Sequence, residues 1–247
     1  MNIVVFDTET TSLEKPFTYN IGYKIIDANT RTELVRREFV AEQTWKNLAL
    51  FSTAYYADKR PIYVNAMRGK KAFLEKYGYI CRIMAKDFRQ YKVEYAYAYN
   101  SPFDEKVFDY NCDWFKCYNP FDSIPIIDIR GCVHSFLIDN DYKEFCEENK
   151  YFTQSGNYST TAETVYRYLF DNNFVEAHTA LADSDIEAEI LFACVDKGAV
   201  VGVSYPVMQS VSRTVPRTLE VVKDGVTHSF DYTKKIVTKE GNKIFLS

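Results

Sequence analysis

A short apolar run at the start of the chain, followed at once by a polar series, constrains the fold more than any other feature. The run covers residues 2–6, with the sequence Asn-Ile-Val-Val-Phe, and the polar series covers residues 7–11. A continuous run of β-branched and aromatic residues is typical of a strand that is buried on both faces. Because helices must then cover the sheet, the run predicts an α/β protein with polar side chains gathered at a strand end.

Two more strand-like stretches follow this run, at residues 19–27 and 33–41, with the turn-like residues 28–31 between them. Consecutive strands joined by a short turn pair with one another, so the first three strands are expected to form an antiparallel meander. Later strands are expected at 93–99, where tyrosines 95, 97 and 99 share one face as sheet core, and at 124–129. Helical spacing predicts helices at 43–91, with a break near Arg60-Pro61, and at 103–110, 131–138, 142–149, 160–171 and 181–197.

The last part of the chain has a different pattern. Residues 218–222 and 226–230 flank Lys223-Asp224-Gly225, and Asp-Gly is a strong signal for a hairpin turn. A second pair of strands is expected at 235–238 and 243–246. We therefore expect an α/β domain at residues 1–202, and a linker with a small β-hairpin appendage at 203–247.

Charge and hydropathy limit the function classes only slightly. The formal net charge of the 247 residues is −4, but residues 213–247 are basic, with seven Lys or Arg against four Asp or Glu. A negative total does not exclude a nucleic-acid substrate, because divalent cations bound to carboxylates reverse the local field. No apolar run approaches the roughly 20 residues that span a bilayer, and no signal peptide precedes the first strand. An intracellular, cytoplasmic protein without a membrane contact is expected.

The cysteine pattern indicates no zinc motif. The six cysteines lie at positions 81, 112, 117, 132, 146 and 194, without a CxxC pair or a nearby histidine. Cys112 and Cys117 lie five positions apart in an aromatic segment, where a soft-metal site is one interpretation. We favour ordinary reduced thiols.

The polar series contains two carboxylates that suit a metal ion. Asp7 and Glu9 are two positions apart at a strand end, so their side chains leave the same face. Like charges that lie close together repel unless a cation neutralises them, and oxygen ligands suit Mg²⁺ or Mn²⁺. The pair alone is equally compatible with an ordinary solvated strand end.

Two later segments add further candidates. Asp104 falls in the first turn of a helix that follows a strand, where an acid is also favoured by the helix dipole. Asp183 opens the strongest helix, and His178 lies five residues before it. A lone histidine at a helix start is often only a hydrogen-bonding residue, so these segments become informative as a set.

In their order along the chain, the three segments resemble the motifs of the DEDDh (DnaQ-like) 3′→5′ exonucleases, a family of the ribonuclease H-like superfamily. Residues 7–11 match Asp-x-Glu-Thr-Thr, residues 100–104 match Asn-x-x-Phe-Asp, and residues 178–183 match His-x-Ala-x-x-Asp. The resemblance covers roughly residues 1–197. It departs at Ser12, where the family usually has glycine, and in long segments between the motifs.

The resemblance implies a fold, a reaction and a set of roles. The fold is a mixed sheet of three antiparallel strands plus parallel strands, flanked by helices. Asp7, Glu9 and Asp183 are expected to bind the cation that activates water, Asp104 to support a second cation, and His178 to accept the proton of the attacking water. The cofactors expected are two divalent cations, Mg²⁺ or Mn²⁺.

The implied substrate is the single-stranded 3′ end of a nucleic acid, with DNA preferred. Residues expected to bind it are Thr8 and Thr10 through their main chain, Leu13 and Phe103 against the terminal base, and Asn100. Arg68, Lys70, Lys71 and the basic tail are candidate phosphate contacts. The alternatives are trimming of RNA ends or short oligoribonucleotides, and a non-catalytic binding subunit that acts with a polymerase or repair partner.

Overall fold

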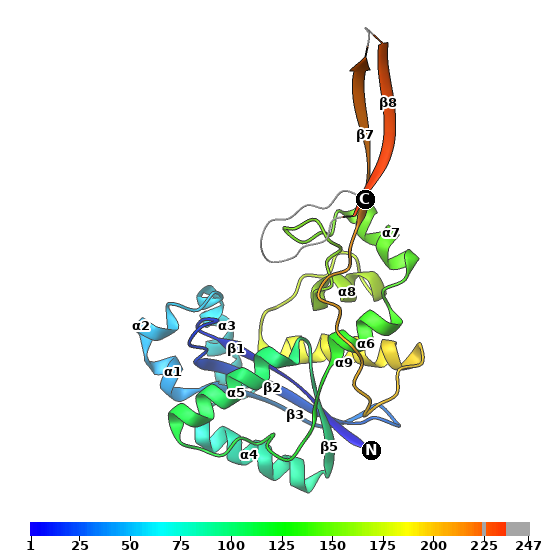
Figure 1. Cartoon of the computed structure of the whole chain (residues 1–247). Coiled ribbons are helices and arrows are strands. Elements are labelled where there is room, and N and C mark those ends of the chain that lie inside the picture. The colour runs from blue at the N-terminus through cyan, green and yellow to red at the C-terminus, as the bar shows by residue number, and fades with distance from the viewer. Residues whose placement is uncertain (224–225, 236–247) are drawn as a thin grey trace.

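The structure, a computed structural model, describes residues 1–223 and 226–235. A six-stranded sheet with the order β4-β3-β2-β1-β5-β6 forms its centre (Figure 1). Its strands are β1 (Asn2–Thr10), β2 (Thr18–Asp27), β3 (Thr32–Ala41), β4 (Phe73–Glu75), β5 (Val93–Ala98) and β6 (Ile126–Asp128). The first three strands form the predicted antiparallel meander, whereas β5 runs parallel to β1 and β6 parallel to β5. This mixed sheet confirms the predicted fold class.

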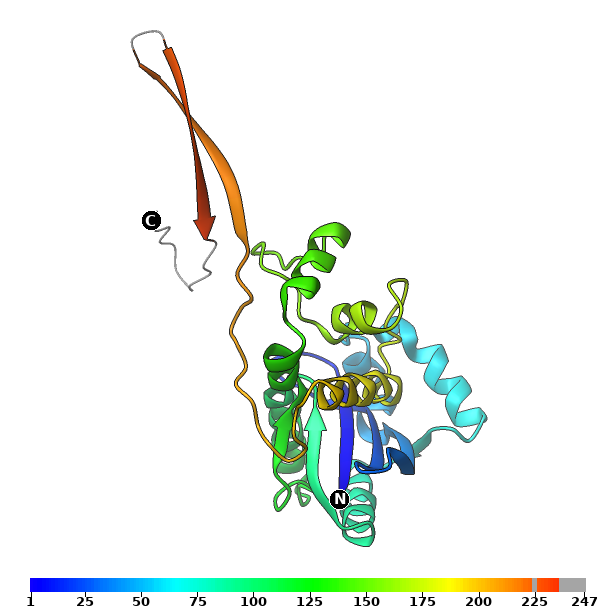
Figure 2. The same cartoon turned by 90° about the vertical axis from the view of Figure 1, so that its right-hand side faces the viewer.

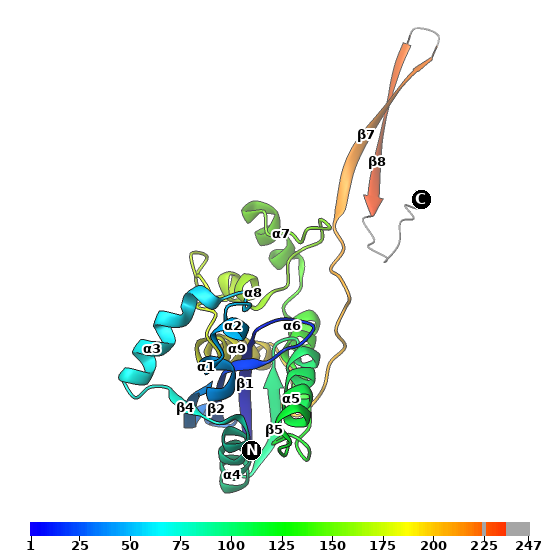
Figure 3. The same cartoon turned by 90° about the vertical axis from the view of Figure 1, so that its left-hand side faces the viewer.

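Both faces of β1 are covered, as its apolar run predicts. Ile3 and Val5 belong to a core with helices α6 (Ile129–Phe136) and α9 (Ala180–Asp196). Val4 and Phe6, which point to the other face, belong to a core with α4 (Tyr77–Gln90) and α5 (Ser101–Phe115). Figures 2 and 3 show α9 on one side of the sheet and α4 with α5 on the other. Tyrosines 95, 97 and 99 lie in the first core, as predicted.

Residues 42–72 build a third, smaller core over one end of the sheet. It contains Tyr19, Val40, Trp45, Phe51, Ala54, Tyr63 and Ala72. The helices here are α1 (Glu42–Lys46), α2 (Leu48–Phe51), the 3₁₀ helix η1 (Ala57–Lys59) and α3 (Arg60–Arg68).

One detail of the prediction for residues 43–91 is wrong. The predicted break near Arg60-Pro61 coincides with a helix boundary, since η1 ends at Lys59 and α3 begins at Arg60, where proline fits the first turn of a helix because its missing N–H costs nothing there. The error is that the segment contains β4, a strand of three residues that pairs with β3. A strand of this length is too short to show a period of its own.

The remaining helices are close to their predicted positions. They are α7 (Asn140–Asn149) and α8 (Ala162–Leu169), in addition to α6 and α9. The side chains of Asp128, Asp139 and Thr161 accept hydrogen bonds from the first turns of α6, α7 and α8. The first N–H groups of a helix have no acceptor within the helix, and these side chains accept their hydrogen bonds instead.

The segment after α9 follows the surface of α6 before it leaves the body. Met208 donates its backbone N–H to Nδ1 of His134 at 2.8 Å. A side chain at Gly131 would come within 2.2 Å of the carbonyl oxygen of Tyr205, so glycine permits this close approach.

The chain then forms the antiparallel pair β7 (Thr214–Lys223) and β8 (Val226–Lys235), which projects from the body (Figure 1). The first predicted hairpin is thus confirmed, while the second lies outside the described residues. The division at residue 202 stays a prediction. Among the described helices, none is both long and apolar enough to cross a bilayer.

Candidate active site

Side chains along a strand point alternately to its two faces, and this alternation in β1 determines the face on which each residue of the polar series 7–11 lies. Asp7 and Glu9 follow Ile3 and Val5 at every second position, so they face α9. Thr8 continues the opposite face, toward α5. The parallel pairing with β5 ends at Val5, so among the described strands residues 6–10 pair with β2 alone. The carboxylates therefore lie at the carboxyl end of the central strands, where α/β proteins commonly bind ligands.

Strand β2 holds the start of α9 against these carboxylates. Asn20 and Gly22 lie opposite Glu9 and Asp7 in the antiparallel pair and face the same helix. The side-chain oxygen of Asn20 accepts a hydrogen bond from the backbone N–H of Ala180 at 2.8 Å. A side chain at Gly22 would come within 2.1 Å of the backbone nitrogen of Leu181, so only glycine admits the helix at this distance.

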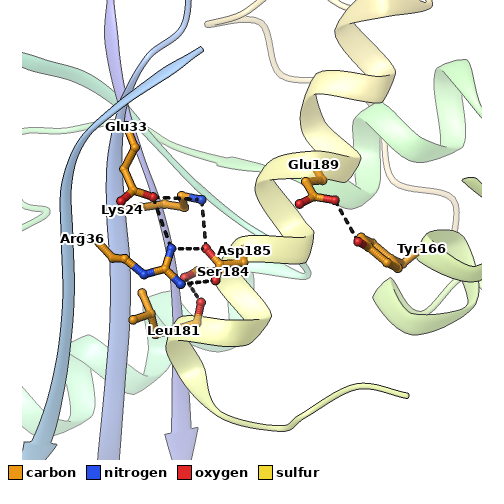
Figure 4. A network of polar contacts seen from close by, with 8 residues as sticks. All are labelled: Lys24, Glu33, Arg36, Tyr166, Leu181, Ser184, Asp185 and Glu189. Carbon is orange, nitrogen blue, oxygen red and sulfur yellow. Dashed lines mark hydrogen bonds and ion pairs between the residues drawn. The ribbon is translucent and has the colours of Figure 1, made fainter. Parts of the chain in front are cut away.

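An ion-pair network fixes the next turn of α9. Asp185 accepts hydrogen bonds from Lys24 of β2 at 2.9 Å and from Arg36 of β3 at 2.7 Å. Glu33 lies 3.3 Å from Lys24 and 3.2 Å from Arg36, as Figure 4 shows. Since these groups are partly exposed, we assign them a role in the orientation of α9 rather than a large contribution to stability.

Asp183 and Asp104 reach the site from two helices. Asp183 lies in the first turn of α9 and is 6% exposed. Asp104 lies in the first turn of α5, is 2% exposed and accepts a hydrogen bond from the hydroxyl of Thr8 at 2.6 Å. Thr8 thus joins β1 to α5 through its side chain.

His178 occupies an unusual backbone conformation before α9. Its φ is +53°, in the left-handed region of backbone conformation that residues other than glycine rarely adopt. Its ring stacks on Tyr56 with centroids 4.1 Å apart and an interplanar angle of 12°. Nδ1 lies 3.6 Å from a carboxylate oxygen of Glu176. Two neighbours thus orient the ring.

These elements bring the predicted residues together. Ligand atoms of Glu9, His178 and Asp183 all lie within 4.8 Å of one another. Asp7 interacts electrostatically with Asp104, Glu9 and Asp183. The three motifs, which lie far apart in the sequence, therefore form one cluster.

Burial and mutual repulsion perturb the carboxyl groups. Burial, followed by the charge of Asp7, raises the pKa of Glu9 to about 9 and that of Asp183 to about 10. Burial raises the pKa of Asp104 to about 7, against the hydrogen bond from Thr8, and raises that of Asp7 well above its usual range. Each shift shows that the ionised carboxylates lack a compensating positive charge.

The residues present fit divalent cations. One carboxylate oxygen of Asp183 (Oδ1) is buried and has no hydrogen-bond partner in the described part of the chain. A buried, unpaired carboxylate oxygen is costly unless a cation binds it. An all-oxygen set of carboxylates suits hard cations such as Mg²⁺ and Mn²⁺.

The sequence reasoning missed three residues around the cluster. Glu187, one turn after Asp183, is 4% exposed, and its Oε2 has no partner among the described residues. Tyr19 donates its hydroxyl to Glu9 at 3.3 Å. Burial raises the pKa of Glu176, the neighbour of His178, to about 7. The spacing of four between Asp183 and Glu187 on one helix face was the available signal for Glu187.

The predicted substrate-binding residues differ in exposure. Leu13 is 73% exposed, Asn100 is exposed with φ +63°, and Phe103 is half-buried and belongs to none of the three described cores. The hydroxyl of Thr10 contacts the carbonyl oxygen of Ser12 at 3.4 Å. The basic residues at 68, 70 and 71 are exposed at and after the end of α3.

The mixed sheet with its covering helices has the ribonuclease H-like architecture of the DEDDh nuclease domains. Among solved structures, the nuclease domain of 3′hExo, a DEDDh family member bound to rAMP, matches with 12% sequence identity and a TM-score of 0.54. That match covers 85% of this chain and 97% of the other. A structure of ExoI in a complex with SSB-Ct matches with 13% identity and a TM-score of 0.50, over 80% of this chain and 41% of that chain.

At these identities the likeness shows a shared fold, which confirms the predicted resemblance at that level. No protein-family model and no curated protein sequence matches the chain.

Proposed function

We propose that this chain is a metal-dependent 3′→5′ exonuclease that releases nucleoside monophosphates from DNA 3′ ends. The observation that carries the proposal is the convergence of Asp7, Glu9, Asp104 and Asp183 beside His178. Acidic residues from three separate elements gather where they repel one another, which is costly for the fold and useful for a hydrolase that binds cations.

In the proposed mechanism, Asp7, Glu9, Asp104 and Asp183 would hold two divalent cations, which would supply the positive charge that activates water and stabilises the phosphoryl oxygens. His178 accepts the proton of the attacking water. Glu176 beside Nδ1 favours a proton on that nitrogen, which leaves Nε2 free to act as the base. Tyr56 holds the ring plane by stacking.

Recognition of the strand end is proposed to be independent of base sequence. No described strand pairs with the main chain of residues 6–10 on its β5 side, so Thr8 and Thr10 are proposed to meet the terminal 3′-hydroxyl through their main chain. The exposed Leu13 and half-buried Phe103 are proposed to contact the terminal base.

A cleft whose lining includes the predicted substrate-binding residue Asn100, but no residue of the carboxylate cluster, is proposed as a path for the phosphates. Asn100 lines it together with Arg130 and Thr160. The guanidinium of Arg130 donates to the Thr160 hydroxyl at 3.3 Å, while its buried Nε has no hydrogen-bond partner in the described part of the chain. The guanidinium of Arg130, which lines the cleft, is proposed to bind a phosphate oxygen.

A second candidate substrate is RNA. The specific observation in its favour is that the similar nuclease domain of 3′hExo was solved with rAMP. DNA remains the preferred substrate in this proposal because the three motifs resemble those of proofreading exonucleases. We also propose that the chain acts together with a polymerase or a repair protein.

The experiment compares 5′-labelled single-stranded DNA and RNA of one sequence with Mg²⁺, Mn²⁺ or EDTA. Stepwise shortening from the 3′ end that stops in EDTA and in Asp7→Asn supports the proposal. Faster shortening of RNA than of DNA would replace the proposed substrate by the second one. Binding without shortening in every metal condition would refute catalysis and leave a non-catalytic binding subunit.

A further inference from the structure

Three thiols meet on the side of the sheet opposite α9. Cys81 of α4, Cys112 of α5 and Cys117 after α5 place their sulfur atoms within 4.8 Å of one another. The Sγ atoms of Cys81 and Cys112 are 4.0 Å apart. The sequence shows only the pair Cys112 and Cys117, since Cys81 lies 31 positions before Cys112 and is added by the packing of α4 on α5.

The backbone is shaped to bring these sulfurs together. Lys116 adopts φ +51° at the end of α5, and this turn lets the N–H of Cys117 donate to the carbonyl oxygen of Cys112 at 3.0 Å. On α4, a side chain at Gly78 would come within 3.1 Å of Cβ of Cys117. Glycine therefore lets the first turn of α4 approach the third thiol closely.

An oxygen donor lies beside the thiols. Tyr77 precedes Cys81 by four residues on α4 and so shares its helix face. Its hydroxyl is buried and interacts with all three thiols, and the thiol of Cys112 is its hydrogen-bonding neighbour. A thiol is only a weak hydrogen-bonding group, so this buried hydroxyl gains little from the contact.

We propose that Cys81, Cys112 and Cys117 bind a thiophilic divalent cation of the Zn²⁺ class, with the hydroxyl of Tyr77 facing the bound ion. Tetrahedral coordination with Zn–S distances of about 2.3 Å places sulfur atoms about 3.8 Å apart. The 4.0 Å between Cys81 and Cys112 needs only a small contraction to reach this value. Cys117 is half-buried, so the ion has a route from solvent.

Such a site is chemically distinct from the carboxylate cluster. Three sulfur ligands select soft or borderline cations, whereas the carboxylates select hard ones. The ion would join the first turns of α4 to the end of α5, the helix whose opposite end carries Asp104. Its role is therefore the attachment of α5 to the body rather than catalysis.

The competing interpretation is a disulfide between Cys81 and Cys112. A disulfide requires the two sulfurs to approach from 4.0 Å to about 2.05 Å, which is a larger movement than metal coordination needs. A Cys81–Cys112 disulfide would also not explain why Cys117 and the hydroxyl of Tyr77 lie beside the two sulfur atoms.

The test titrates Co²⁺ into the full chain after reduction and treatment with EDTA. The expected result is a sulfur-to-cobalt charge-transfer band that saturates at about one equivalent and that Zn²⁺ abolishes. Co²⁺ at the carboxylate cluster has only oxygen and nitrogen ligands, so it produces no such band. The band should be lost in Cys81→Ser and kept in Cys132→Ser, a matched control because Cys132 is also buried but lies outside the cluster.

A second measurement covers the case in which Cys81→Ser does not fold. In the wild-type chain, Cd²⁺ should slow the alkylation of Cys117 by at least about tenfold, because a coordinated thiolate is a poor nucleophile. The proposal is overturned if the wild-type chain shows no charge-transfer band, if alkylation of Cys117 is unchanged by Cd²⁺, or if the purified chain contains a Cys81–Cys112 disulfide.

Discussion

Replacement of Gly22 by alanine tests how the catalytic geometry is held. The added Cβ would lie 2.1 Å from the backbone nitrogen of Leu181 and 2.3 Å from its Cα. Ordinary contact begins at 3.4 Å, so the start of α9 would have to retreat by about 1.3 Å, the difference between 3.4 and 2.1 Å. The obstacle is backbone rather than a flexible side chain, so rotation of a side chain cannot relieve it. Asp183 and His178 lie within three residues of Leu181 and would move with it.

The expected loss of activity follows from that displacement. A misplacement of about 1 Å at a catalytic group costs about 10²-fold in rate, and overpacking of a core costs about 1–3 kcal/mol. Gly22→Ala should therefore lower kcat/KM about 100-fold while urea denaturation shows a fall in stability of about 1–3 kcal/mol. Rates are measured on labelled oligonucleotide with saturating Mg²⁺, at a temperature where circular dichroism shows a folded variant.

Gly69→Ala is the control for this variant. Gly69 lies at the exposed end of α3, with φ −78° and its nearest obstacle, the carbonyl oxygen of Asn65, at 3.3 Å. This variant should keep both stability and rate near the wild-type values. Wild-type activity in Gly22→Ala would refute the argument that the sheet surface at this position sets the place of Asp183.

Three further predictions concern charge and proton transfer. Carboxyl groups with a raised pKa, such as Glu9 near 9 and Asp183 near 10, contribute stability that is complete below their ordinary pKa near 4 and is lost as the pH rises through the raised values. The melting temperature in EDTA should thus fall from pH 5 to pH 9, and Mg²⁺ should raise it more at pH 9 than at pH 5. Differential scanning fluorimetry measures these melting temperatures. An equal increase in melting temperature with Mg²⁺ at both pH values would contradict the metal assignment. His178→Ala should lower kcat about 10²- to 10⁴-fold and leave the calorimetric affinity for Mn²⁺ within about twofold, whereas an unchanged kcat would remove His178 from the mechanism. Arg130→Gln should raise KM for the oligonucleotide and change kcat little, and steady-state kinetics that show the reverse would exclude Arg130 as a phosphate contact.

The local pattern of the sequence was sufficient to single out Asp7, Glu9, Asp104, His178 and Asp183, which the structure brings together, because each motif lies at the boundary of a regular element. Asp7 and Glu9 are separated by the period of a strand, and Asp104 and Asp183 fall in first turns that helix-start signals mark. Periodicity also predicted the meander and the long final helix of the sheet domain. It failed for β4, since three residues hold too few repeats to distinguish a strand from a helix.

Long-range packing decided what no local pattern encodes. Asn20 and Gly22 looked like ordinary strand residues, and only the tertiary structure shows that they face α9 and fix its distance from the sheet. The sequence analysis did not single out Glu187, yet it is buried and interacts electrostatically with Asp7, Asp104 and Asp183.

The sequence by itself therefore predicted the motif residues of the candidate site and the chemistry that they suit, because residue type and spacing are local properties. Only the tertiary structure decided how close those residues lie, which neighbours hold them and that three distant cysteines meet. Those facts depend on contacts between elements that are far apart in the chain, and such contacts are set by the packing of the whole domain.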